Sequence, residues 1–404
     1  MLKLALATVA TIASIQVSAT SYPLSDSFSG TSFLYVINRF PSLTRQTANE
    51  LLSDGFRFPV ETYDNTTNGD VFWATADNTS LLYVNENNRV IIKVDNESDV
   101  VYLQKRYAPK LLSQKTWDIG TVWVMDAVHM PYGCSVWPAF WTQGPNWPAG
   151  GEIDISEGIN LRTNNMVALH TTGGTCTISN SSSMTGSITY DNCDISQNSD
   201  SGCTVNDTNA NSYGEGFAAA GGGVLVAEWA TDGIRVWFLT RNAVPSSLSV
   251  SASSIDTSTL GEPVAQYSSD TCDVQNLFGP QTLTIDITLC GDFAGNADLL
   301  AETCGALVGD NTCYTTYVVN NQSSTLAQAY YEINYINVYS SNSNASATST
   351  TTSGAATSAT SGSGSTGSAS ASAGGSGSSS GAGRVETVLG GLFGALLFGL
   401  AMIL

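Results

Sequence analysis

Short runs of strand-forming residues recur through the chain, and this pattern limits the possible folds more than any other feature. The runs are rich in Val, Ile, Tyr, Trp and Thr, which suit a pleated, half-buried surface. Turn-forming residues separate them, and the pair Asp232–Gly233 between two runs predicts a β-hairpin. A helical pattern occurs at Leu43–Leu52. The sequence therefore predicts an all-β sandwich or jelly roll. The runs are Arg89–Val94, Val100–Leu103, Thr121–Ala127, Val224–Trp229, Gly233–Leu239, Thr282–Ile287 and Tyr330–Tyr339.

The two ends of the chain resemble processing signals. Residues 1–19 contain Lys3, an apolar stretch and a small-residue cleavage site, the pattern of a secretory signal peptide. Residues 340–383 are almost entirely Ser, Thr, Gly and Ala, which bury too little apolar surface to fold, so we expect a disordered stalk. Residues 384–404 combine a polar spacer with an apolar tail, the pattern of a removable glycolipid (GPI) anchor signal. A membrane span is the alternative, although basic residues usually follow one.

These segments leave residues 20–339 as one domain of a secreted, surface-anchored protein, which we expect to be monomeric. The net charge is -20 and only 12% of the residues are charged. Nucleic acid is therefore excluded as a partner, because phosphate binding needs clustered Lys and Arg, and a neutral polymer fits better. Seven Asn-x-Ser/Thr acceptors fit a secreted protein; they are Asn65, Asn78, Asn96, Asn180, Asn206, Asn321 and Asn344.

The 8 cysteines of the chain predict disulfides, because a secreted protein meets an oxidising environment. The sequence does not select among the possible pairings. With only two histidines and no Cys-x-x-Cys pair, we expect no zinc site and no cofactor.

One glycine-flanked segment, GGEIDISEG, carries the candidate chemistry. Its isoleucines alternate with Glu152 and Asp154, so a strand here would turn the isoleucines to the core and the acids outward. In a regular strand Glu157 would point into the core, where an unpaired carboxylate is costly. We therefore predict a β-bulge near Ile155 or Ser156, whose extra residue returns Glu157 to the acid face.

Three carboxyls on one strand face are crowded. Same-face neighbours lie about 7 Å apart along a strand, and tilting can bring the side chains of Glu152 and Glu157 to about 5 to 5.5 Å, the spacing of a retaining glycosidase. Crowding should keep at least one carboxyl protonated near neutral pH. This would supply a general acid beside a nucleophile. A solvated acidic strand or a calcium site is the alternative.

Aromatic residues immediately before the acids favour the catalytic interpretation. Trp137, Phe140, Trp141 and Trp147 precede the acid segment, together with three prolines. Aromatic rings stack on the apolar faces of sugar rings as they do on other apolar surfaces. Some of these rings must belong to the core, but aromatics beside acids are what a polysaccharide-cleaving site needs.

These stretches resemble glycoside hydrolase family 16, and most closely its fungal endo-1,3(4)-β-glucanases, the laminarinase-like branch. The resemblance covers residues 22–339. It implies a β-jelly-roll sandwich of the concanavalin or lectin type with a cleft on its concave face. It also implies hydrolysis of internal β-1,3 or mixed β-1,3/1,4 glucosidic bonds of β-glucan with retention. The matching stretches are residues 133–142, 146–148, 151–160, 169–172, 227–229, 286–292 and 331–335.

The resemblance also implies a role for each site residue. Glu152 would be the nucleophile and Glu157 the general acid, then the base, while Asp154 would hydrogen-bond the nucleophile. Four further residues would bind the substrate; they are Trp137, Trp141, Trp147 and His170. The second histidine, His129, should be structural.

The extra residue of the acid motif separates related activities. Wall transglycosylases and lichenases of the family lack it, and the laminarinase-like branch has it, so its presence favours hydrolysis. A cell-wall glucan transglycosylase and a non-catalytic glucan-binding wall protein are the alternatives. Three positions depart from the branch: Ser156 replaces a frequent aliphatic residue, Phe293 a tryptophan and Lys110 an arginine.

Overall fold

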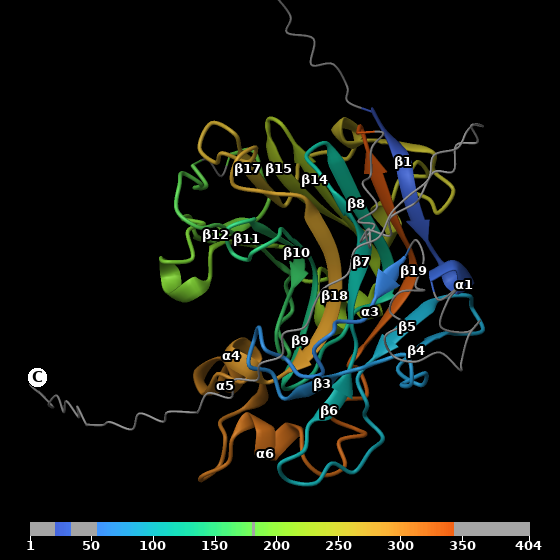
Figure 1. Ribbon diagram of the computed structural model, residues 1–404, viewed down its shortest axis with the longest axis vertical. Helices are drawn as coiled ribbons and strands as arrows, with labels where there is room; N and C mark the ends of the chain where they lie inside the picture. Colours follow the sequence, from blue (N-terminus) through green and yellow to red (C-terminus); the bar gives the residue numbers. More distant parts are fainter. Residues whose placement is uncertain (1–20, 34–54, 180–181, 343–404) are drawn as a thin grey trace, which may run out of the picture. The chain divides into compact units, whose positions relative to one another are not determined.

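The structure is a computed structural model that describes residues 21–33, 55–179 and 182–342. These residues form two large antiparallel sheets and a small parallel pair of strands (Figure 1). The predicted signal peptide, the helical pattern at Leu43–Leu52 and nearly all of the stalk and tail lie outside the described residues. The chain divides after Thr350, and the unit that follows also lies outside them.

The first sheet runs in the order β16-β1-β19-β8-β14-β15-β17, and β4 and β5 extend it beside β19. Its strands are β16 (Ser254–Asp256), β1 (Ser21–Phe28), β19 (Tyr330–Ser340), β8 (Thr121–His129), β14 (Gly223–Ala230), β15 (Gly233–Thr240), β17 (Ala265–Ser268), β4 (Leu82–Val84) and β5 (Val90–Lys93).

The second sheet runs in the order β12-β13-β11-β10-β9-β18-β7-β2, and Figure 1 shows β10 between β9 and β11. Its strands are β12 (Ser187–Tyr190), β13 (Cys203–Asn206), β11 (Met166–His170), β10 (Glu152–Glu157), β9 (Val136–Gln143), β18 (Gln281–Leu289), β7 (Lys110–Trp117) and β2 (Phe56–Arg57). The parallel pair is β3 (Val71–Trp73) and β6 (Arg106–Ala108).

The helices among the described residues are short and lie in connections between strands. They are α1 (Gly30–Phe33), α3 (Gly214–Ala219), α4 (Gly291–Ala294), α5 (Ala297–Cys304), α6 (Cys313–Tyr317), and the 3₁₀ turns η1 (Asn198–Asp200), η2 (Arg241–Ala243) and η3 (Thr257–Thr259). None of the helices in the described ranges is long and apolar enough to cross a membrane.

One apolar core lies between the two large sheets. Phe140 and Ile153 from the second sheet and Trp123 and Leu225 from the first are at most 2% exposed. Burying each side chain of this size contributes about 1.5–3 kcal/mol. The core fixes which face of β10 turns inward. The isoleucines of β10 pack into the core, and its carboxyls face the other way because an unpaired carboxylate is costly to bury.

A second apolar cluster covers the outer face of the first sheet. Val122 and Val124 of β8 pack there with Leu248 and Ile255, which come from the segment between β15 and β17. Strand β8 is therefore buried on both faces, and this explains its nearly continuous apolar sequence.

All eight cysteines form disulfides, as the sequence predicted. The structure supplies the pairing, because each bridge joins segments that only folding brings together. The bridges are Cys134–Cys304, Cys176–Cys272, Cys193–Cys203 and Cys290–Cys313.

Most predicted strands are confirmed, and so is the hairpin of β14 and β15, in which Ala230 pairs with Gly233 across a two-residue turn. The predicted strand Val100–Leu103 is wrong. Val100 forms a single bridge to Asn320, and the chain then turns, with Leu103 at φ 73°. The run is short and its side chains do not pack against a sheet, since Tyr102 is 66% exposed.

Candidate active site

The predicted bulge in β10 is confirmed. Against β9, Asp154 lies opposite Trp141 and Ser156 lies opposite Phe140, so Ile155 has no residue opposite it. The same shift occurs against β11, between Asp154 and Glu157. The register therefore returns Glu157 to the face that carries Glu152 and Asp154, while Ser156 turns to the core.

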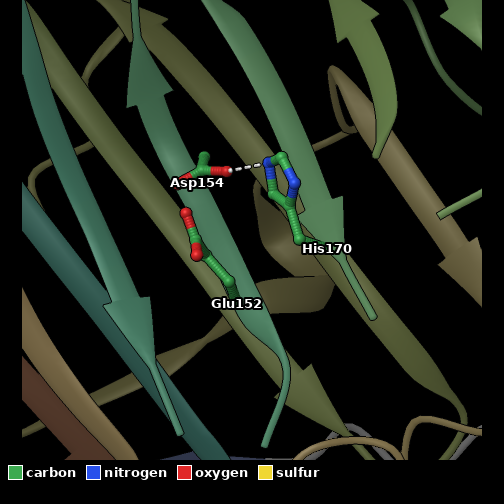
Figure 2. A group of neighbouring side chains, drawn as sticks. All are labelled: Glu152, Asp154 and His170. Atoms are coloured by element: carbon green, nitrogen blue, oxygen red, sulfur yellow. Dashed lines mark ion pairs between the residues drawn. The ribbon is translucent and has the colours of Figure 1, made fainter. Parts of the chain in front are cut away.

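The acids are bordered by His170 of β11, which lies opposite Glu152. Its Nε2 lies 3.1 Å from Oδ2 of Asp154, and Figure 2 shows the ring turned toward the two carboxyls. The side chains of His170 and Asp154 are only 14% and 4% exposed. The three groups therefore form one buried electrostatic unit, in which an imidazolium would offset the carboxylate charges.

The same three residues could hold a cation, because one ligand atom from each lies within 4.8 Å of the others. A metal ion would compete with the proton shared by His170 and Asp154, since a metal ligand needs the neutral imidazole. The charges of Glu152 and Asp154 raise the pKa of His170, so the contact is an ion pair with a protonated ring, and this suits tuning of the carboxyls better than metal binding.

Glu157 has a different partner. Nε1 of Trp137 donates a 2.7 Å hydrogen bond to its Oε1. Trp137 comes from β9, and its ring packs edge-on against Phe293 with ring centres 5.5 Å apart. Phe293, one of the departures from the laminarinase-like pattern, thus holds the indole that contacts Glu157.

Burial sets the protonation of the acids. It raises the pKa of Glu157 to about 7, although the Trp137 hydrogen bond and the charge of His170 oppose the rise. Burial and the charge of Asp154 also raise the pKa of Glu152. Burial alone would lower the pKa of His170, but the charges of Glu152 and Asp154 outweigh it and raise the pKa. A proton on Glu157 near neutral pH makes this carboxyl a candidate general acid.

The structure brings the remaining predicted substrate residues to the same place. Trp147 lies in the loop before β10, its ring is 48% exposed, and its Nε1 donates to Oε2 of Glu152. Trp141 shares the acid face of β9, but it bonds to Asp286 rather than to an acid of β10, with a distance of 2.6 Å from Nε1 to Oδ1. His129, expected to be structural, lies in β8 of the other sheet, stacked on Tyr330.

Asp286 is a site residue that the sequence reasoning did not assign. It lies opposite Ala139, which in turn lies opposite Glu157, so the two carboxyls share one row across the sheet. Burial raises the pKa of Asp286, and it remains at about 6 although the charge of Lys110 opposes the rise. The alternation in QTLTIDITL, with buried Leu283 and Ile285 beside the acid, was the signal that could have identified this face.

Lys110 lies beside Asp286 in the adjacent strand β7. Its Nζ lies 5.3 Å from the ring centre of Trp141 and 5.3 Å from that of Trp73. Cation–π attraction of this kind is strengthened where water is excluded, and Lys110 is 6% exposed. A lysine at a position where the related enzymes often have arginine is thus held between two indoles, and Trp73 joins the site from the small parallel sheet.

Two glutamates on one face of a β-sandwich, both with a raised pKa and both hydrogen-bonded to indoles, have the arrangement that a glycoside hydrolase needs. Residues 56–339 match the family described as "XgeA-like, catalytic GH16 domain". The chain therefore belongs to glycoside hydrolase family 16.

Curated relatives carry names of the same class. The chain is 35% identical over 303 residues to a probable glycosidase of Schizosaccharomyces pombe, covering 74% of this chain and 69% of that protein. It is 33% identical over 289 residues to the endo-1,3(4)-beta-glucanase xgeA of Emericella nidulans, covering 68% of this chain and 43% of that protein. The chain thus spans less than half the length of the second relative.

Solved structures have the same fold. Laminarinase 16A from Phanerochaete chrysosporium, with beta-glucans in both donor and acceptor sites, is 33% identical with a TM-score of 0.67. An elongating family 16 beta-1,3-glucosyltransferase is also 33% identical, with a TM-score of 0.68. Each comparison covers 79% of this chain and 100% of the other.

Proposed function

We propose that the protein is an endo-β-glucanase that hydrolyses internal β-1,3 or mixed β-1,3/1,4 glucosidic bonds with retention. The observation that carries this proposal is the bulge of β10, which turns Glu152 and Glu157 to one face. The environments of the two carboxyls differ, since one lies against Asp154 and His170 and the other against Trp137. Such a difference suits two carboxyls with different roles.

In the proposed mechanism Glu152 attacks the anomeric carbon while Glu157 donates its proton to the departing glucosidic oxygen. A covalent glycosyl-enzyme results. Glu157, now ionised, removes a proton from water, which attacks the same carbon and releases Glu152. His170 stabilises the carboxylate of Glu152 before the attack and after its release, because the imidazolium charge lowers the pKa of Glu152. Asp154 holds the ring of His170 in place, with its Oδ2 3.1 Å from Nε2.

The test is to express residues 22–339 and incubate the protein with laminarin, barley β-glucan, lichenan and cellulose. Reducing ends should accumulate from the β-1,3-containing glucans. Proton NMR should show the β-anomer of the new reducing end first, as retention requires. Glu152→Gln and Glu157→Gln should each abolish or strongly reduce release. Unchanged release by both variants would instead favour a non-catalytic glucan-binding wall protein with a contaminating activity.

Transfer to a sugar acceptor is the second candidate. The observation that favours it is the similarity to an elongating beta-1,3-glucosyltransferase, which equals the similarity to the laminarinase. Both reactions pass through the same glycosyl-enzyme, so the fold does not separate them. Product analysis does: transfer lengthens laminari-oligosaccharides without a net gain of reducing ends, and hydrolysis shortens them with such a gain.

We also propose that the protein is secreted and held at the outer face of the cell membrane or in the cell wall by a glycolipid anchor, and that it is monomeric. The pattern of residues 340–404 supports the anchor. Phosphatidylinositol-specific phospholipase C should release the protein from intact cells. Asn65 and Asn321, whose side chains are exposed, are the acceptors expected to carry glycans, and a glycosidase that removes N-glycans should lower the apparent mass.

A further inference from the structure

We propose that Asn165 is a positioning residue that holds the bulge of β10 and thereby sets the direction of Glu157. This inference rests on the proposed function, because it takes Glu157 as the general acid. Asn165 directly precedes β11 and is 1% exposed. It belongs to the core side of the sheet, so it acts through the strand and not through contact with sugar.

The bulge interrupts the pairing of β10 with its neighbours at Ile155, so the main-chain groups there need other hydrogen-bond partners. Ile155 is 0% exposed and has no residue opposite it on β9, and against β11 neither Ile155 nor Ser156 is paired. A buried main-chain carbonyl without a partner costs free energy, and a strand can avoid that cost by returning to regular register. A regular register would turn Glu157 into the core. Whatever binds the bulged peptide therefore also keeps the acid on its face.

Asn165 binds both sides of this peptide. Its Nδ2 donates a 3.2 Å hydrogen bond to the main-chain oxygen of Ile155. Its Oδ1 accepts a 2.7 Å hydrogen bond from Oγ of Ser156. One planar amide thus fixes the two residues that join Asp154 to Glu157.

Asn165 is itself held rigidly. Its main-chain N–H donates a 2.9 Å hydrogen bond to Oγ of Ser212, and its main-chain oxygen accepts one of 2.9 Å from the N–H of Asp207. Ser212 is 0% exposed, and its hydroxyl donates in turn to the main-chain oxygen of Asn209. An anchor needs this rigidity, because a mobile amide would let the bulged peptide rotate.

Ser156 is the second residue of the bulge that binds the Asn165 amide. It lies opposite Phe140 on the core face and is 1% exposed, so its hydroxyl needs a buried partner. Asn165 is that partner. Where the laminarinase-like pattern often has an aliphatic residue, this chain has a hydroxyl bonded to the amide, so the departure at Ser156 leaves no buried hydroxyl without a partner.

The experiment separates positioning from general loss of structure by varying the leaving group. Asn165→Ala is compared with the wild type on laminarin and on a 2,4-dinitrophenyl β-glucan oligosaccharide, whose leaving group needs no proton. We expect kcat on laminarin to fall about 10-fold or more, because a misplaced acid loses much of its catalytic effect. The burst of dinitrophenolate, which reports the attack by Glu152, should stay within about 3-fold of wild type.

Azide gives a second readout. It is already an anion, so it needs no general base to attack the glycosyl-enzyme. Azide should therefore speed the slow turnover of Asn165→Ala on the dinitrophenyl substrate and yield a glycosyl azide. Ser156→Ala removes only one of the two hydrogen bonds and should show the same pattern with a smaller loss, and it serves as the test if Asn165→Ala does not fold.

Asn337→Ala is the matched control. Asn337 is 0% exposed, lies in β19 of the other sheet and donates to the main-chain oxygen of Ser249. Its loss should lower Tm without changing the ratio of the two activities. If Asn165→Ala and Ser156→Ala reduce both activities equally, as Asn337→Ala would, the positioning role is wrong. If the wild type releases neither sugar nor dinitrophenolate, it is the proposed function that fails.

Discussion

The indole of Trp137 donates its N–H to the carboxylate oxygen of Glu157 at 2.7 Å, from the strand next to the one that carries the acid. A hydrogen bond of this kind is stronger when the carboxyl is ionised, so it lowers the pKa of the acid. Burial acts in the opposite direction and prevails, with the pKa at about 7. The protonation of Glu157 is therefore a balance between desolvation and one indole.

Removing the hydrogen bond from Trp137 to Glu157 should shift the alkaline limb of the pH–activity profile. Trp137→Phe keeps a ring and loses the hydrogen bond, so the pKa of Glu157 should rise and the loss of kcat/KM at high pH should begin at a higher pH. The measurement is kcat/KM on laminarin from pH 4 to 10. Trp237→Phe is the control, because the indole of Trp237, in β15 of the other sheet, donates to the main-chain oxygen of Gly261 and not to a carboxylate. Equal profiles for Trp137→Phe and wild type would contradict the role of the bond.

Loss of the His170 charge should shift both limbs of the pH profile of kcat/KM in the same direction. Its positive charge lowers the pKa of Glu152 and that of Glu157. His170→Gln should therefore raise both, so that activity appears and disappears at higher pH than in the wild type. The profile of kcat/KM provides the check, with His129→Gln as the control at the chain's other histidine, whose ring lies against Tyr330. A profile of lower kcat/KM whose two midpoints stay at their wild-type pH values would argue against an electrostatic role.

The acid proposed to donate the catalytic proton should make the folded protein less stable as pH rises from about 4.5 through 7. The pKa of Glu157 is raised from 4.5 to about 7, so in this window the folded protein retains a proton that the unfolded chain has released. Stability is full below about pH 4.5 and falls as pH rises through 7. Because one pKa unit corresponds to about 1.4 kcal/mol, and because Glu157 is only half-buried, we expect a loss below about 3 kcal/mol.

Glu157→Gln removes this loss, since an amide does not ionise. Its Tm should exceed that of the wild type at pH 8 and equal it at pH 4, as thermal unfolding followed by circular dichroism would show. Glu86→Gln, at an exposed glutamate, should show no such difference. A Tm gain of the same size at both pH values would point to packing rather than to ionisation.

Trp147 should contribute to binding and not to stability, because its ring is 48% exposed. Trp147→Ala removes the ring face and should raise KM for laminarin about 3- to 10-fold, the value of one aromatic contact, with Tm unchanged. Trp147→Phe keeps the ring face but cannot donate to Glu152, so it should preserve KM and alter kcat. If both variants changed KM alike, the ring face would not be the binding element.

The sequence was informative where the chemistry is local. The alternation of Ile153 with its acidic neighbours defined the strand, and the cost of a buried Glu157 required the bulge. Both follow from residues within one short segment. The strand predicted at Val100–Leu103 was wrong because local composition does not reveal whether a sheet lies near enough to pair with the run.

Tertiary structure decided which distant residues surround the acids. Asp286 and Lys110 reach the site because β18 and β7 follow β9 in the sheet, an order that has no counterpart in the sequence. The pairing of the cysteines was settled in the same way. By itself, the sequence determined which carboxyls must share one face of one strand. Only the fold determined their protonation, because desolvation and neighbouring charges depend on groups that the sheet places around them, from His170 on the next strand to Asp286 on β18.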